Sequence, residues 1–160
     1  MSNESNVQLA SSDWQSYVCK INDELASVFV DLALSAVAPL PTKPKLTWLW
    51  IRLIKPRENG LSSDDEFESL CDFEDDLEAT IARSKSCIYV GRITTKGRRE
   101  FYFYADSEFD LKREVTDVLA KHPTYASQLG EKLDASWDHF LFTLLPGSNG
   151  MDQIARRKRS

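Results

Sequence analysis

The sequence has few of the residues that would place it outside the ordinary globular class. Only 6 glycines and 6 prolines occur in 160 residues, which excludes a collagen-like or low-complexity chain. The 3 cysteines are odd in number and form no C-x-x-C pair, which favours a reducing, cytoplasmic location over a disulfide framework. No run of about 18 apolar residues is present, so we expect no membrane-spanning helix.

Motifs of known catalytic chemistry are also missing. There is no HExxH, G-x-S-x-G, P-loop or G-x-G-x-x-G pattern, and His122 and His139 are the only histidines. The acidic segment lacks both the glycine of an EF-hand loop and the Glu-x-x-His spacing of a dinuclear centre. We therefore expect no cofactor and no metal, and these absences favour a non-enzymatic protein.

Charge of one sign is concentrated in one segment. Nine acids and no base lie between Asp64 and Glu78, whereas four bases lie in the last ten residues (Arg156 to Arg159). Without those ten residues, 16 basic against 24 acidic side chains leave a charge of −8. A body of that charge repels nucleic acid, so we do not expect a nucleic-acid partner. The basic end is interpreted as a disordered, solubilising tail, and a nucleic-acid anchor is the alternative interpretation.

Chain length suits one domain with two tails. Residues 1–12 are polar and predicted to be disordered, residues 13–146 form a single α+β domain, and residues 147–160 form a flexible basic tail. Proline at positions 39, 41 and 44 predicts a stiff connection near the start of the domain.

Hydrophobic periodicity predicts six strands and two helices. The capping box Ser63–Glu66 is expected to start one helix, and Ser107 the other. The turns are expected at residues 22–24 and at Lys96-Gly97, where glycine permits a tight hairpin. The expected strands are Trp14–Ile21, Leu25–Leu34, Leu46–Ile54, Ile88–Thr95, Arg98–Ala105 and Trp137–Leu145; the expected helices are 63–84 and 107–122.

From residue 46 onward, this order reads β-α-β-β-α-β. It predicts a ferredoxin-like split βαβ arrangement, an antiparallel sheet with both helices on one face. The N-terminal β-hairpin is expected to extend this sheet at an edge.

Side-chain alternation predicts an aromatic face on the side of the sheet without helices. An exposed set of this kind would mark a partner surface, ligand groove or subunit contact. In the other interpretation, the hairpin, the proline-rich connection or the C-terminal segment covers this face and forms a second small core. The predicted face comprises Trp48, Trp50, Arg52, Tyr89, Tyr102, Tyr104, Trp137 and His139.

The acidic helix is the second candidate surface. A solvated helix face is one interpretation of its acids, and a surface that docks a basic protein is the other, because complementary charge speeds and selects association. The candidate partner-binding residues are Asp64, Asp65, Glu68, Asp72, Asp75 and Asp76.

The segment Cys87 to Tyr104, CIYVGRITTKGRREFYFY, resembles the core signature of an uncharacterised bacterial domain family of unknown function. Further similarities over residues 13–146 are Gly60-Leu61, Glu74-Asp75, Trp14 with Tyr17, and Trp137 with Leu145-Pro146. In some relatives this domain stands beside one similar to the regulator of ribonuclease E activity B, an acidic inhibitor with a ferredoxin-like fold. The resemblance implies an intracellular bacterial protein and favours protein binding, and it transfers no catalytic residue. Arg92, Thr94, Arg99 and Glu100 match the signature.

Our leading hypothesis is a non-enzymatic protein-binding module that regulates or inhibits a basic partner, such as a nuclease or a toxin. The alternative is a small-ligand binder or enzyme whose pocket lies on the aromatic face, with Arg52 and His139 as polar groups. A third hypothesis is a homodimer that forms through the aromatic face.

Overall fold

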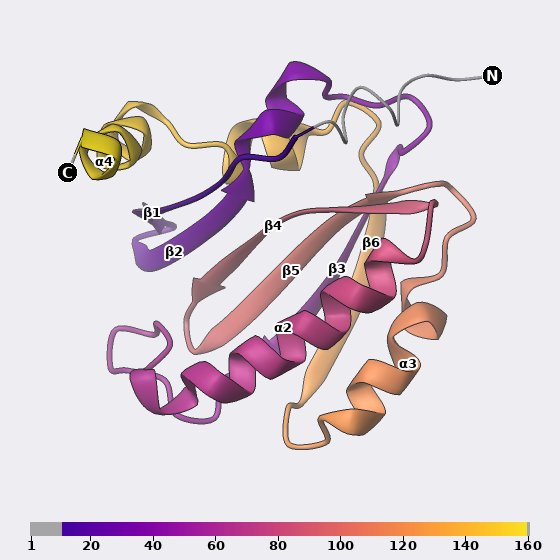
Figure 1. Ribbon diagram of the computed structural model, residues 1–160, viewed down its shortest axis with the longest axis horizontal. Helices are drawn as coiled ribbons and strands as arrows, with labels where there is room; N and C mark the ends of the chain where they lie inside the picture. Colours follow the sequence, from indigo (N-terminus) through magenta and orange to yellow (C-terminus); the bar gives the residue numbers. More distant parts are fainter. Residues whose placement is uncertain (1–10, 160) are drawn as a thin grey trace.

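The computed structural model describes residues 11–159, so most of the predicted disordered start lies outside the described residues. An antiparallel six-stranded sheet with the order β1-β2-β4-β5-β3-β6 forms the centre (Figure 1). The strands are β1 (Trp14–Ile21), β2 (Glu24–Asp31), β3 (Lys45–Arg52), β4 (Cys87–Thr95), β5 (Arg98–Ala105) and β6 (Ser127–Leu133). The helical segments are η1 (Leu32–Ala36), η2 (Asp64–Glu66), α2 (Phe67–Ala82), α3 (Leu111–Lys121), η3 (Phe140–Leu144) and α4 (Ser148–Arg159). The predicted α+β class is confirmed.

Two tight hairpins agree with the sequence. Asn22 and Asp23 join β1 to β2, and Lys96 and Gly97 join β4 to β5, all four with positive φ. Such paired positive φ values match the twist of the flanking strands. The N-terminal hairpin pairs through β2 with β4, so β1 is an edge strand of the sheet.

Helices α2 and α3 cover one face of the sheet, as the hydrophobic pattern predicts (Figure 1). Leu49 and Ile51 of β3 and Phe101 and Phe103 of β5 point into this core. Inward side chains of both helices, among them Phe73 and Val115, are completely buried against them. This apolar layer provides the main hydrophobic stabilisation of the domain.

The opposite face is covered as well, by the connection after β2 and by residues 134–145. Leu34 and Leu40 come from the connection, and Trp137, Phe140 and Leu144 come from the later segment. The second core also contains Tyr102 and Tyr104 of β5. Of the two interpretations of this face, the structure therefore has the second, in which other segments cover the face and form a second small core.

The last strand is not the predicted one. Residues 137–145 are not a strand, because Phe140–Leu144 forms η3, a π-helical turn that follows the positive φ of Trp137. The sixth strand is β6, which pairs with β3. Its sequence, SQLGEKL, is largely exposed and lacks the apolar alternation by which strands are recognised. The apolar run at 137–145 instead covers the second face of the sheet.

The carboxylate of Asp134 holds this covering segment on the sheet. It accepts hydrogen bonds from the Tyr104 hydroxyl (2.7 Å) and from the backbone N–H groups of Asp138 and His139 (3.0 and 3.1 Å). Burial by itself raises the pKa of Asp134, but these hydrogen bonds outweigh it and leave the pKa below its usual value. Trp137 consequently stacks on Tyr104 with 4.1 Å between ring centroids.

Neither predicted side-chain cap forms, although Ser63 is the N-cap residue of η2, which leads directly into α2. The side chain of Glu66 does not turn back to Ser63; its carboxylate accepts hydrogen bonds from the backbone N–H groups of Ile54 and Lys55, and α2 begins at Phe67. Asp110, not Ser107, caps α3 by accepting from Arg113 N–H at 3.4 Å. Tertiary hydrogen bonds thus take Glu66 away from the expected capping box, whereas α3 keeps a local cap that lies three residues later than expected.

The predicted flexible tail is corrected too, because residues 148–159 form helix α4. Its Ile154 is 2% exposed, so a buried aliphatic side chain anchors the helix to the domain. Among the described residues, no helix combines the length and apolar character needed to cross a membrane.

Gly130→Ala tests the packing of β6. A methyl group at position 130 would lie 2.4 Å from the Trp48 ring, so the indole must move off the strand. We expect this overpacking to lower the free energy of unfolding by about 1–3 kcal/mol in urea unfolding experiments. Gly147→Ala is the control, since nothing lies within 4 Å of a methyl group there. Equal stability of the two variants would contradict the packing described.

Candidate functional site

The conspicuous polar cluster of the protein lies between α2 and the sheet. The Glu74 carboxylate, on a residue that is 6% exposed, accepts hydrogen bonds from the Tyr89 hydroxyl (3.0 Å) and from Arg92. The Arg99 guanidinium lies 3.9 Å from the same carboxylate and donates to the Thr94 hydroxyl at 2.9 Å. Two guanidinium groups therefore share one buried carboxylate.

The electrostatics of this cluster follow from its burial. Burial and the nearby Arg92 charge lower the pKa of Arg99 to about 10. Burial, followed by the Glu74 charge, raises the pKa of Tyr89 well above its usual value. At neutral pH, Arg99 therefore stays protonated and positively charged, and Tyr89 stays protonated and neutral. The cluster is accordingly a permanent ion-pair network and not an acid–base pair.

Aromatic rings continue the cluster toward the N-terminal hairpin. The Arg92 guanidinium lies over the Phe29 ring at 4.6 Å from its centroid. Trp14 stacks on Phe29 and also contacts Tyr89, at centroid distances of 4.8 and 5.0 Å. Residues from five elements, β1, β2, α2, β4 and β5, are thereby tied together.

The predicted aromatic face is divided by the covering segment 134–145. Tyr102, Tyr104 and Trp137 are buried in the second core, whereas Trp48 and Trp50 are half-buried. Arg52 is exposed at the end of β3, opposite Arg98 in the register. Within residues 11–159, the part of this face beside β6 is the part left open to a partner.

One residue of the predicted aromatic set lies on the other face. Tyr89 contacts Phe101 and Phe103 beneath the helices. The cause is a β-bulge, visible as a register shift between Tyr89 and Gly91, because one extra residue reverses the side-chain parity before it. Ile88 and Val90 lie on the opposite side and join the second core.

A second, buried polar group lies on the face of the sheet away from the helices. The Glu100 carboxylate, 4% exposed, accepts from Tyr102 (2.7 Å) and from Arg98 (2.5 Å). Arg98 in turn covers the Trp50 ring at 4.0 Å from the centroid. The His139 ring packs against the Tyr102 ring in a tilted arrangement with 4.2 Å between centroids, and burial lowers the pKa of His139 to about 4. A neutral imidazole in this setting packs as an aromatic ring.

The acidic helix keeps most of its predicted surface. Asp76 is the exception: it is half-buried and pairs with His122 at 2.7 Å and with Lys121 at 3.3 Å, both from the α3 end. The hydrogen bond from His122 lowers the pKa of Asp76. The other five predicted acids are exposed, namely Asp64, Asp65, Glu68, Asp72 and Asp75.

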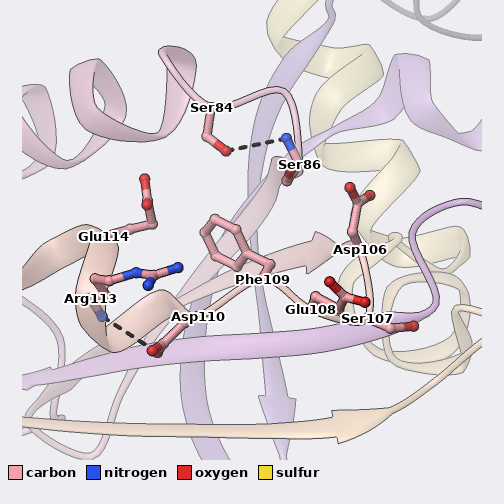
Figure 2. Close-up of a pocket in the computed structure, with 9 residues that line it drawn as sticks. All are labelled: Ser84, Ser86, Asp106, Ser107, Glu108, Phe109, Asp110, Arg113 and Glu114. Atoms are coloured by element: carbon pink, nitrogen blue, oxygen red, sulfur yellow. Dashed lines mark hydrogen bonds between the residues drawn. The ribbon is translucent and has the colours of Figure 1, made fainter.

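A polar cavity of about 480 Å³ lies where the loop after α2 meets the loop before α3 (Figure 2). Its floor is Phe109, and Asp106 at its rim pairs with Lys43 at 3.0 Å. Asp110 is occupied as the α3 cap. None of the predicted site residues lines it. No three His, Cys, Asp or Glu side chains among residues 11–159 are grouped so that they could hold a metal ion.

The Glu74 network was absent from the predicted site, although its signal is visible in the sequence. Glu74 follows Leu70 by four residues and precedes Leu77 by three, so it lies on the buried stripe of the helix. Arg92 stands opposite Phe101 in the hairpin register and therefore points under the helices. The inward orientation of both residues predicts a buried ion pair.

Comparison with known proteins gives one match. The family model of a family of unknown function, DUF695, matches residues 12–145. This confirms the resemblance to an uncharacterised family of unknown function. No curated protein and no solved structure matches the chain significantly.

Glu74→Gln tests the buried network. The variant keeps the shape of the side chain but leaves the Arg92 and Arg99 charges without a carboxylate. We expect the free energy of unfolding to fall by about 3 kcal/mol in urea unfolding. The neighbouring exposed substitution Asp75→Asn should change it by less than about 0.5 kcal/mol. Similar losses for both variants would show that the network adds nothing to stability.

His139→Phe tests the buried imidazole. Unfolded histidine takes up a proton near pH 6.5, whereas folded His139 does so only near pH 4. Wild-type stability relative to the variant should therefore be full above pH 6.5 and fall by up to about 1.4 kcal/mol per pH unit toward pH 4. Urea unfolding of both proteins across this range measures it; a constant difference would refute the burial. Both proteins contain His122, so the difference in stability between them reports on position 139 alone.

Proposed function

The chain belongs to the DUF695 family of unknown function, and we propose that it is a non-enzymatic module that binds a basic protein partner. In this proposal the exposed carboxylates of η2 and α2 dock against the positive surface of the partner. A nuclease or a toxin held inactive is the kind of partner that suits such a surface. Binding would then regulate or inhibit that partner.

The observation that carries the proposal is the exposure of these acids without internal counter-charges. Within residues 11–159, the ion pairs of the acidic segment involve only Glu74 and Asp76. Glu68, Asp72 and Asp75 are spaced by four and three residues, so they share one helix face. A negative stripe of this length attracts a cationic surface and accelerates its association.

An apolar side chain accompanies the charges. Phe67, the first residue of α2, is 65% exposed. Interfaces gain most of their binding energy from a few buried anchors, and aromatic side chains serve this role well. Phe67 therefore supplies contact area, whereas the acids supply steering.

We also infer that residues 45–133 form a ferredoxin-like split βαβ unit. Helix α2 connects β3 to β4, which both flank β5, and α3 connects β5 to β6, which both flank β3. All neighbouring strands are antiparallel. This arrangement supports the inference, with β6 in place of the strand that the sequence predicted.

The proposal places the protein in the cytoplasm. Cys19, Cys71 and Cys87 are free thiols, which suits a reducing compartment. The alternative pocket function has less support, because the cavity of Figure 2 is lined by neither Arg52 nor His139.

The triple variant Glu68→Lys/Asp72→Lys/Asp75→Lys tests the proposed function. The wild-type protein first captures its partner from a native lysate, and surface plasmon resonance then measures binding of the purified partner. We expect the association rate constant to fall by about tenfold or more in the variant, because electrostatic steering is lost. The wild-type rate should also fall as ionic strength rises.

A matched control carries the same change of charge elsewhere. Glu24, Glu108 and Asp138 are exposed acids outside α2, so their reversal to Lys alters net charge equally. This control should retain most of the wild-type association rate. If both triple variants bind equally well or equally badly, α2 is not the docking surface.

A further inference from the structure

The edge strand β1 exposes backbone groups that a further strand could pair with. In β1, the N–H and C=O groups of Val18 and the C=O group of Ser16 point away from β2. Their hydrogen bonds to side chains outside the sheet show this direction. Uncovered edges of this kind pair readily with other chains.

Helix α4 occupies this edge in the manner of a strand. The Gln153 carboxamide accepts a hydrogen bond from Val18 N–H at 2.9 Å and donates one to Val18 C=O at 2.8 Å. A residue opposite Val18 in an antiparallel strand would exchange the same two hydrogen bonds. One turn further along, the Arg157 guanidinium donates to the Ser16 carbonyl.

Within residues 11–159, few buried residues fasten the helix. Ile154 is buried, and Gly150 lies so close to Tyr17 that a methyl group there would be 2.9 Å from the ring. The hydrogen bonds of Gln153 and Arg157 are exposed to solvent. Helix α4 lies beyond β1, apart from α2 and α3, and follows the family-matched residues 12–145 (Figure 1). Elements held by so few buried contacts open more easily than the core.

We propose that α4 is a detachable cap on the β1 edge, and that the uncapped edge pairs with the β1 edge of a second copy of this chain. The two strands run antiparallel with Val18 opposite Val18, so each Val18 supplies to its twin the two hydrogen bonds that Gln153 supplies in the capped state. Val18 is β-branched and its side chain is 42% exposed, so the central pair also buries apolar surface. Capping and pairing exclude each other, because both use the same groups. The inference is independent of the acidic surface on α2.

The test uses the full chain with Gln153→Ala and Arg157→Ala. Hydrogen exchange followed by NMR should show the Val18 amide exchanging about tenfold or more faster in dilute solution, where the edge is open. Sedimentation equilibrium should show the mean mass of this variant rising toward twice the chain mass with concentration, while the wild-type protein stays monomeric. Met151→Ala/Asp152→Ala is the control, because both side chains are exposed on the same helix. It should behave as wild type.

Adding Val18→Lys to the uncapped variant identifies the surface. Like charges then face each other at the centre of the pair, so the dimer should be lost while circular dichroism remains native. The proposal is overturned if the uncapped variant stays monomeric at every concentration, or if its dimer survives Val18→Lys. It is equally overturned if Val18 exchange is unchanged in dilute solution, or if wild type dimerises as strongly as the variant.

Discussion

The carboxylate of Asp134 organises the side of the sheet that the helices leave open. By accepting three hydrogen bonds it joins β5, through Tyr104, to the turn that leads into residues 137–145. A buried charged group is tolerated here because its acceptor capacity is used by the hydroxyl and the two N–H groups. Trp137 and Leu144 can then close the second core, and the chain leaves that core at Pro146 to form α4 along β1.

On the helix-covered face, buried charged groups are stabilised by an ion-pair network. Glu74 compensates Arg92 and Arg99 under α2, where an unpaired guanidinium would be costly. One buried carboxylate thus offsets part of the charge of two guanidinium groups, whereas most of the remaining acids of α2 face solvent. This arrangement leaves a group of negative charges on the outer surface of α2, where they can act at a distance.

These two arrangements leave different surfaces for different contacts. The outer surface of α2 suits an oppositely charged protein, whereas the β1 edge offers directional hydrogen bonds to an extended strand. A partner on α2 and a second copy on β1 would occupy separate parts of the molecule. The half-open tryptophans beside β6 form a third, smaller surface, which Arg98 partly covers through Trp50.

Local patterns in the sequence determined the elements whose reasons are local. Positive-φ turns at residues 22–23 and 96–97, the amphipathic stripes of α2 and α3, and the alternation in β3 follow from nearest neighbours, and the structure agrees with them. Only tertiary structure decided the rest. The bulge before Gly91 turns Tyr89 beneath the helices. The register of β4 is set by its pairing with β5, and the sequence of β4 by itself does not reveal it. Likewise, residues 127–133 become strand β6 by pairing with the edge of β3. Residues 137–145, which include the π-helical turn Phe140–Leu144, pack across a face of the sheet and do not extend it.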